Sequence, residues 1–241
     1  MGGPFSEDLF EPCHRSYAQE STCQGLLGGV LVGWQGVENM AGRPNEIIVT
    51  AAEGELVQEA ARRAGKPGLY LGPYPPGGVS SQAILCNHSA AKLDPARTQI
   101  PIQLMPELKL NWAKLDLALY CQSHGVHPWT DIVSVIGAFC RNALESSIAQ
   151  TAGVLGAWSF TGGSTASVWS TDIEGLCARK RNLWANCATT RALERHVGNP
   201  VFLLGYASAG PATEMALLET AAYTVAYTAA GGELIWGGST C

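Results

Sequence analysis

The sequence is poor in charged residues and lacks the features of several common classes of protein. Of its 241 residues 15% are charged and 46% are hydrophobic, which describes a chain with a sizeable core. A net charge of −5 offers no basic surface to nucleic acid. No apolar run reaches the roughly 18 residues of a membrane span, and the first residues do not form a signal peptide. We therefore expect a cytoplasmic protein that binds neither nucleic acid nor a membrane.

Motifs for nucleotides, disulfides and metals are also lacking. There is no P-loop, and no expected strand is followed by G-x-G-x-x-G. The eight cysteines are scattered without a C-x-x-C pair, so we expect buried or partly buried free thiols. His124 and His127 flank Gly125, and no further zinc ligands can be assigned to them. We expect no metal site.

Short apolar runs alternate with patterns of helical periodicity along the chain. The expected strands are 26–34, 69–71, 132–139, 157–160 and 201–206, and the expected helices are 45–64, 107–124 and 213–229. Glu59 and Arg63 form an i,i+4 pair on the first of these helices. Repeated strand–helix–strand order and uniformly apolar strands indicate a parallel α/β sheet. Spacing alone does not separate a (β/α)8 barrel from a doubly wound sheet.

Polar residues near the ends of two expected strands are candidates for a site. Asp131 directly precedes the strand 132–139, and Tyr206 closes the strand 201–206. Barrels and doubly wound sheets both carry their chemistry at the carboxyl ends of strands, so a carboxylate and a phenol there could face one pocket. The alternative is that Asp131 caps a turn and that Tyr206 is a core aromatic. Composition alone favours the second reading.

The sequence contains three distinctive motifs, SEDLFEPCHRSYA at residues 6–18, AGKPG at residues 64–68 and AGPATEMALLE at residues 209–219. They resemble motifs of the monomethylamine:corrinoid methyltransferases, the pyrrolysine-containing methylamine methyltransferases. Residues 6–18, SEDLFEPCHRSYA, are similar to the family's S-E-D-(V/L)-F-x-P-x-H-x-S-Y-A. Residues 64–68, AGKPG, resemble its A-G-R-P-G, and residues 209–219, AGPATEMALLE, resemble its A-G-P-C-T-E-M-C-L-L-E. The resemblance implies an α/β fold of the (β/α)8 TIM-type barrel. It also implies that residues 1–241 are a single barrel-type domain, incomplete at both ends because the family's N-terminal extension and C-terminal tail are lacking.

The resemblance implies methyl transfer from monomethylamine to the Co(I) corrinoid of a cognate corrinoid protein, as in methylamine-dependent methanogenesis. An amine is a poor leaving group, and in the family a pyrrolysine imine adds it at the ring carbon while a neighbouring acid supports protonation. The chain itself then binds no cofactor directly, because the partner protein carries the corrinoid (cobalamin). A homo-oligomer is also expected.

The pyrrolysine position of the family falls between Leu71 and Gly72. Family members read P-G-x-x-x-O-G-P, where O is pyrrolysine, whereas residues 67–73 read PGLYLGP and are one residue shorter. Either a residue outside the twenty-letter alphabet is omitted from the written sequence, or this homologue lacks it. Leu71 and Gly72 are assigned to the substrate pocket on this basis.

The resemblance assigns further pocket residues one by one. Asp131 matches a pocket glutamate and is implied to be the acid near the imine, and Tyr206 matches a pocket tyrosine. Leu204 corresponds to a pocket glutamine of the family, and another pocket glutamate corresponds to about Pro101. Two readings therefore compete with an active methyltransferase. One is an inactive or repurposed barrel homologue without pyrrolysine, and the other is a barrel enzyme that acts on another small substrate through Asp131 and Tyr206.

Overall fold

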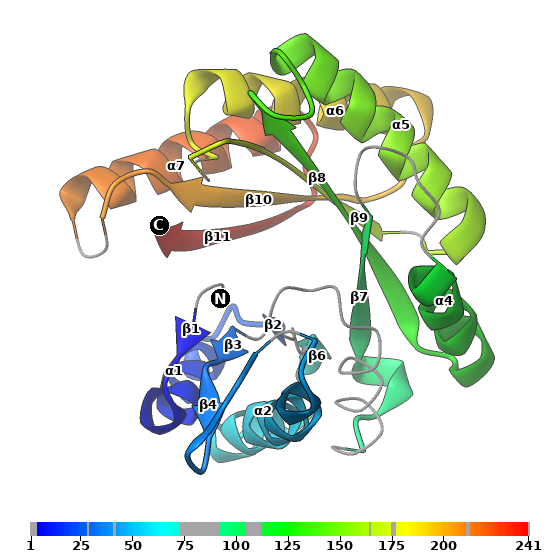
Figure 1. The fold of residues 1–241 in the computed structure, drawn as a ribbon. Coiled ribbons are helices and arrows are strands. Elements are labelled where there is room, and N and C mark those ends of the chain that lie inside the picture. Colours follow the sequence, from blue (N-terminus) through cyan, green and yellow to red (C-terminus); the bar gives the residue numbers. More distant parts are fainter. Residues whose placement is uncertain are drawn as a thin grey trace. The chain divides into compact units, whose positions relative to one another are not determined.

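The computed structural model describes residues 4–27, 29–40, 42–72, 92–104, 112–163, 165–174, 177–210 and 213–240 (Figure 1). The chain folds into two compact units. Unit 1 comprises residues 1–101 and 116–128, and unit 2 comprises residues 102–115 and 129–241.

Unit 1 consists of two long helices and several short strands. Its elements are β1 (Pro4–Phe5), α1 (Glu7–Gln19), β2 (Gly25–Leu27), β3 (Val30–Leu31), β4 (Gly33–Trp34), β5 (Val37–Glu38), α2 (Pro44–Arg63), β6 (Tyr70–Gly72) and the 3-10 helix η2 (Pro95–Arg97). Strand β1 pairs with β3 and β2 pairs with β6, both in parallel, while β4 and β5 form an antiparallel pair. The expected strand 26–34 is thus divided among three short strands.

Helix α2 confirms the first expected helix almost to the residue. Pro44 stands at its start, where proline has no helical hydrogen bond to lose, and Gly65 follows its end with φ +75°. The expected pair is present, with Arg63 Nε 2.6 Å from Glu59 Oε1. Hydrogen bonds and charge from Arg62 and Arg63 lower the pKa of Glu59 to about 2.

A buried histidine connects α1 to the segment between β2 and β3. His14 has no exposed surface and stacks on Phe10, with ring centroids 4.1 Å apart. Its Nδ1 lies 2.6 Å from the Phe10 carbonyl oxygen, and Gly29 N–H donates to its Nε2 over 3.4 Å. These two contacts require the neutral tautomer that carries its proton on Nδ1. Burial accordingly lowers the pKa of His14 from 6.5 to about 4.

We expect the stability of unit 1 to fall as the pH drops from 6.5 to about 4. The unfolded chain takes up a proton on His14 in this range and the folded chain does not, so acid favours unfolding. The full loss attributable to this group is about 3 kcal/mol. Urea denaturation at a series of pH values measures it, and His14→Gln, which cannot titrate there, is the comparison. An equal pH slope in both proteins would contradict the assignment.

Unit 2 and the elements that cross into it form a five-stranded sheet, with helices between the strands. The elements are β7 (Gln99–Leu104), α4 (Trp112–His124), β8 (His127–Ile136), α5 (Ala143–Thr161), β9 (Thr165–Asp172), α6 (Lys180–His196), β10 (Val201–Ala207), α7 (Glu214–Ala229) and β11 (Leu234–Thr240). The sheet order is β11-β10-β9-β8-β7. In register, Asp131 pairs with Ser167, and Phe202 also pairs with Ser167. The expectation of an α/β fold with a parallel sheet is confirmed.

One face of this sheet is covered by α5, α6 and α7 (Figure 1). Alternate residues of β8, β9 and β10 point to it and form an apolar cluster with the helices; its strand members are Ile132, Ala166, Val168, Val201 and Leu203. Two tyrosines of α7, Tyr223 and Tyr227, complete the cluster. Gly205 of β10 lies so close to Tyr223 that a Cβ built on it would be 2.3 Å from a ring carbon. Glycine at this position therefore sets the distance between α7 and the sheet.

A buried polar network also connects α6 and α7 to the sheet. Asn186 of α6 accepts from Ser170 N–H over 2.7 Å and donates to the Tyr227 hydroxyl over 2.9 Å. That hydroxyl donates to the Leu204 carbonyl over 3.2 Å, and burial raises the pKa of Tyr227. Because buried polar groups are costly unless paired, this chain of bonds favours one packing of α6 and α7 on the sheet.

One sequence-based expectation for unit 2 is wrong, and one strand was not expected. Residues 157–160 lie inside α5, where Ala157 is buried in the apolar cluster, so they form no strand. The true neighbour of β8 is β9, which was not expected. Helix α7 confirms the expected helix 213–229. Its Met215, Leu218 and Val225 are exposed, whereas Tyr223 and Tyr227 lie on its inner side.

Candidate functional site

The candidate site lies on the face of the unit 2 sheet opposite its helices. Strand alternation places Asp131 of β8, Ser167 and Trp169 of β9, and Leu204 and Tyr206 of β10 on this face. Partial exposure within β9 and β10 occurs mainly here, at Trp169 and Tyr206. The sheet thus presents both predicted catalytic side chains, Asp131 and Tyr206, on one face.

Asp131 is buried and held by two donors from the neighbouring strand. Ser167 Oγ donates to its Oδ1 over 2.6 Å, and Trp169 Nε1 donates to the same oxygen over 2.9 Å. The register explains the first contact, since Asp131 and Ser167 are paired residues. Only 2% of Asp131 is exposed, and it lies in the middle of β8 rather than before the strand as expected. It is therefore neither a turn cap nor a surface carboxylate.

Trp169 also contacts Tyr206, so the indole ring lies between the two predicted residues. The ring centroids of Trp169 and Tyr206 are 5.6 Å apart, with planes inclined by 56°. By register, Tyr206 is four residues nearer the carboxyl end than the level of Asp131, an offset of about 13 Å along the strands. The Trp169 indole bridges this distance, because its Nε1–H donates to Asp131 and its ring contacts Tyr206. Tyr206 is half-buried, so it packs against Trp169 and is also partly exposed.

The remaining predicted residues differ in their surroundings. Leu204 is 3% exposed and lies on the same face as Tyr206, and Pro101 is buried in β7. Leu71 and Gly72 belong to unit 1, in β6, where they pair with Leu26 and Leu27. Residues 73–91, which include Pro73, lie outside the described part of the chain.

The side chain of Leu71 faces α2. It packs in the apolar cluster of unit 1 with Val57 and Ala61, and it lines a cavity of about 230 Å³ together with Thr98. Arg62, Lys92 and the ion pair of Asp94 with Arg97 surround the same cavity, with Arg97 Nε 2.9 Å from Asp94 Oδ2.

In the parts of the chain that the structure describes, the His, Cys, Asp and Glu side chains form no metal-binding cluster. No group of three or more His, Cys, Asp or Glu side chains is placed to hold a metal there. His124 stacks on Tyr120, with ring centroids 4.1 Å apart. The six cysteines in those parts are free, and all are buried or half-buried, as expected. None of the helices in those parts is both long and apolar enough to cross a membrane.

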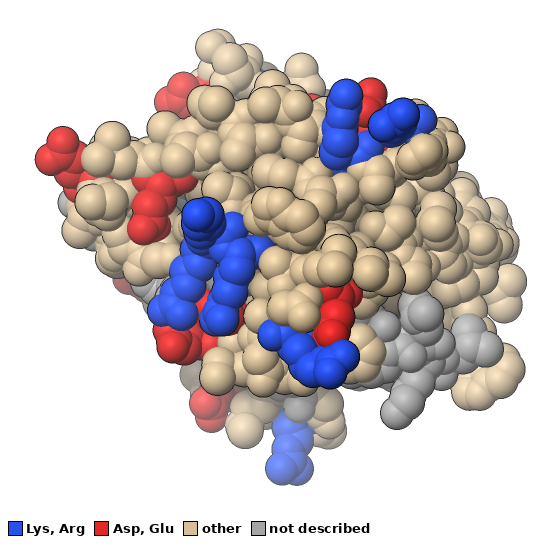
Figure 2. All heavy atoms as spheres, turned by 90° about the horizontal axis from the view of Figure 1, so that it is seen from above, with Lys and Arg blue, Asp and Glu red and all other residues tan. Residues whose placement is uncertain are grey.

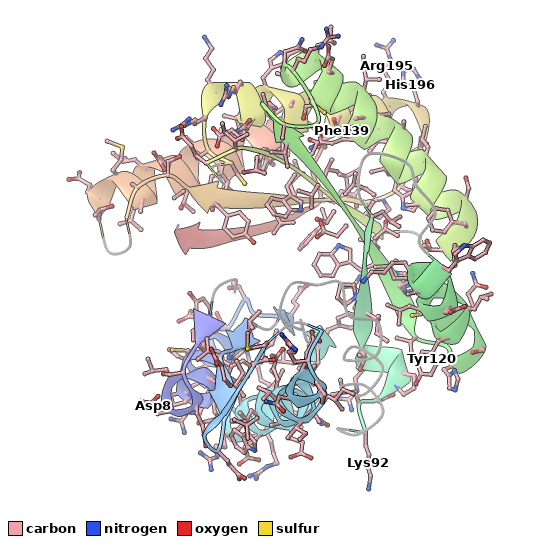
Figure 3. All side chains as sticks on the ribbon, in the orientation of Figure 1. Asp8, Lys92, Tyr120, Phe139, Arg195 and His196 are labelled. Atoms are coloured by element: carbon pink, nitrogen blue, oxygen red, sulfur yellow. The ribbon has the colours of Figure 1, made fainter. Side chains whose placement is uncertain are left out.

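The outer side of the unit 2 helices carries charges of both signs. Figure 2 shows Lys and Arg side chains next to Asp and Glu on this side, among a large uncharged area. One ion-pair group joins Asp172, at the end of β9, to Arg179 and Arg181 over 3.0 and 3.1 Å. Figure 3 shows Phe139 just beyond β8, and Arg195 with His196 at the end of α6. The side drawn in Figure 2 is therefore not the uniformly basic surface that a nucleic acid needs.

Sequence reasoning missed Ser167 and Trp169. Both lie in β9, which was not expected because Thr165–Asp172 mixes polar and apolar residues and falls beside the misassigned run 157–160. The alternation of Ser167, Trp169 and Thr171 with Ala166, Val168 and Ser170 was the available signal for a strand.

Comparison with known proteins decides the family. The family model for monomethylamine methyltransferase MtmB matches residues 1–241. The chain belongs to this family. The resemblance of its three sequence motifs is thereby confirmed.

Curated relatives in the MtmB family are about twice as long. Monomethylamine methyltransferase MtmB1 of Methanosarcina acetivorans is 28% identical over 254 residues, and MtmB of Methanosarcina mazei is 27% identical over 254 residues. Each match covers 98% of this chain and 51% of the relative. The chain thus spans about half the length of the curated relatives it matches.

Solved structures agree in fold. The crystal structure of the Methanosarcina barkeri monomethylamine methyltransferase (MtmB) superposes with a TM-score of 0.89 at 23% identity, covering 99% of this chain and 52% of that one. The homocysteine methyltransferase MmuM from Escherichia coli gives a TM-score of 0.51 at 14% identity, covering 97% and 80%. The mixed α/β fold with its parallel sheet is therefore that of the MtmB family.

Proposed function

We propose that the protein transfers a methyl group from monomethylamine to the Co(I) corrinoid of a partner protein, as in methylamine-dependent methanogenesis. Membership of the MtmB family supports the reaction class. A structure of a family member in complex with hydroxylamine, a molecule of similar size, supports a small amine as substrate. The observation in this chain that carries the proposal is the group of Asp131, Trp169 and Tyr206 on one sheet face.

The chemistry assigns a separate task to each residue of this group. Asp131 is the acid that supplies or holds a proton beside the amine nitrogen, because buried carboxyl groups can be tuned for proton transfer. Ser167 and Trp169 fix its Oδ1, so the orientation of the carboxyl is set before the substrate arrives. Tyr206, nearer the carboxyl end and partly exposed, contacts the substrate from the opening.

The geometry of β6 fits an additional residue between Leu71 and Gly72. Leu71 points toward α2, so by strand alternation the next residue points to the opposite face. An inserted residue takes the place of Gly72 opposite Leu27, and Gly72 moves one place along the chain. Pyrrolysine at this position supplies the imine that receives the amine. This is the site that we propose for it.

We expect the gene to contain an in-frame amber codon, TAG, between the codons for Leu71 and Gly72. The natural protein is then heavier than the printed sequence by one residue at this position. DNA sequencing across the two codons and the intact mass of the protein measure this. The unaltered codons for residues 64–70 serve as the internal reference. Continuous codons for Leu71 and Gly72 would contradict the proposal for this gene.

A second candidate is an inactive or repurposed homologue. The observation that favours it is that Leu204 and Pro101 are apolar and buried where the family has polar pocket groups. Purified natural protein, incubated with monomethylamine and its reduced corrinoid partner, decides between the two. Methyl transfer excludes the inactive homologue. Transfer from another small methyl donor alone supports the third reading, a barrel enzyme that uses Asp131 and Tyr206 on a different substrate.

We further propose a single (β/α)8 barrel domain in a cytoplasmic homo-oligomer. Strand neighbours follow chain order from β7 to β11, as in barrels, and an isolated parallel bridge joins Leu71 to Thr98 at the start of β7. The exposed aliphatic side chains of α5 and α7, among them Ile148 and Leu217, support contact with a second copy. The oligomeric state stays a prediction, which sedimentation equilibrium of the natural protein tests.

A further inference from the structure

Large apolar side chains are exposed on the turns that follow β8 and β9. These two strands end at the same level, because Ile136 pairs with Asp172 in the register. Phe139 lies just beyond β8 (Figure 3) and is 48% exposed, and Ile173 lies just beyond β9 and is 69% exposed. Ile173 also packs against Gly137, where an added Cβ would lie 3.2 Å from its Cγ2, so the two turns adjoin. Exposed apolar side chains that gather in one place mark an interaction surface.

A hollow lies between the starts of α5 and α6, the helices to which these turns lead. Its volume is about 510 Å³, and it is lined by Ala143, Arg179, Lys180, Arg181 and Trp184. Trp184 is 50% exposed. Tryptophan and arginine are among the residues that contribute most to the binding energy of protein–protein contacts. The composition of the hollow is therefore typical of a surface that binds another protein.

A buried carboxylate holds two of these arginines in place. Asp172 Oδ2 accepts from Arg179 Nη1 over 3.0 Å and from Arg181 Nη2 over 3.1 Å, and the Asp172 side chain has no exposed surface. The Arg179 and Arg181 side chains themselves remain 39% and 48% exposed. Side chains that are ordered before a partner arrives lose less conformational entropy on binding. Asp172 thus prepares both arginines for contact with a partner.

The charge of this region disfavours a symmetric contact between two copies of the chain. Arg179 also pairs with Glu174, whereas Lys180 is exposed and pairs with no carboxylate of the described residues. The region therefore carries an excess of positive charge. In a symmetric contact of two copies the same surface faces itself, so Lys180 would approach its own counterpart. An acidic surface of a different protein is attracted instead.

We propose that this region of unit 2, the rim patch, is the docking surface for an acidic face of the partner protein that carries the corrinoid. The rim patch consists of Phe139, Ile173, Arg179, Lys180, Arg181 and Trp184. The identity of the partner rests on the proposed function. The rim patch lies at the carboxyl ends of β8 and β9, the strands that carry Asp131 and Trp169. Because parallel α/β folds open their sites at the carboxyl ends of the strands, a protein that delivers a corrinoid to an amine beside Asp131 approaches over this end.

Two substitutions of exposed residues in the rim patch test the docking surface in the natural protein. We expect Lys180→Glu to raise the KM for the reduced corrinoid partner about tenfold at an ionic strength of about 0.01 M, and this effect to shrink as added salt screens the charges. Trp184→Ala should raise the same KM about tenfold at low and high salt alike, because it removes an apolar contact. In both variants kcat and the KM for monomethylamine should change less than about twofold, because neither side chain contacts the amine.

Arg195→Glu is the matched control, since it makes the same change of charge on an exposed residue at the other end of α6 (Figure 3). If the KM for the corrinoid partner is as low in Lys180→Glu and Trp184→Ala as in this control, the docking surface is overturned while the proposed function stands. Dissociation of an oligomer by Trp184→Ala, measured by sedimentation equilibrium, also overturns it, because the rim patch would then contact a second copy. Natural protein that transfers no methyl from monomethylamine to the reduced corrinoid partner overturns the proposed function, and with it the identity of the docked protein.

Discussion

Gly205→Ala is expected to lower the free energy of unfolding of the protein by about 3 kcal/mol, at the upper end of the range for an overpacked core. The added Cβ would lie 2.3, 2.5 and 2.6 Å from three carbons of the Tyr223 ring. That ring is 1% exposed and packs in the cluster between α7 and the sheet. It has no free space to turn into, so either α7 or β10 must move. Urea denaturation, monitored by circular dichroism, measures the change.

Gly156→Ala is the matched control for this experiment. Gly156 lies within α5, and a Cβ added to it meets nothing within 4 Å. Because alanine is the better helix former, this variant should be stabilised by up to about 1 kcal/mol. Equal stabilities of the two variants would contradict the close approach of β10 and Tyr223. The double variant Gly205→Ala with Tyr223→Leu should recover part of the loss, since it removes the ring that clashes.

Asp131→Asn is expected to lower kcat/KM for methyl transfer by a factor of about 100 or more, the usual effect of removing a general acid. The amide retains an oxygen that accepts from Ser167 and Trp169, so the geometry around it is preserved while the titratable proton is lost. The measurement is the rate at which monomethylamine methylates the reduced corrinoid partner. The circular dichroism spectrum and the denaturation midpoint establish that the variant is folded.

Asp116→Asn is the control variant, which shows how the loss of a carboxylate outside the site affects the rate of methyl transfer. Asp116 lies exposed on α4, and its replacement should leave the rate unchanged. A rate for Asp131→Asn within about threefold of the wild type would exclude Asp131 as the acid. The hydrogen bonds between Trp169 and Asp131 would then have a structural role only, and the acid would have to be a different group.

The elements predicted correctly are those whose own residues mark where they begin and end. Helix α2 has Pro44 at its start and Gly65 after its end, and β10 is a continuous apolar run, so both were expected within a residue or two. Residues 157–160 carry no such signal. A run of four apolar and small residues fits a buried helix as well as a strand, and the choice depends on Gly153 packing against Ile132 of β8, a contact between distant parts of the chain.

The candidate site was predictable only in part for a related reason. Asp131 and Tyr206 were found by their type and by resemblance, and each lies on the expected sheet. The link between them depends on Trp169, whose role follows from the register of β8 with β9. The register is set by the packing of whole strands, so the residues around Trp169 do not predict which residue of β8 it will contact.

The position of Trp169 gives this protein an optical reporter of its own site. An indole that donates its N–H to Asp131 and lies against Tyr206 changes its fluorescence when either neighbour changes charge or moves. Under the proposed function, a small amine that binds beside Asp131 would alter the polarity around the indole, and no attached label would be needed to follow it. Trp169 is one of seven tryptophans in the chain, so the difference in emission between the protein and Trp169→Phe would isolate the signal that reports on Asp131.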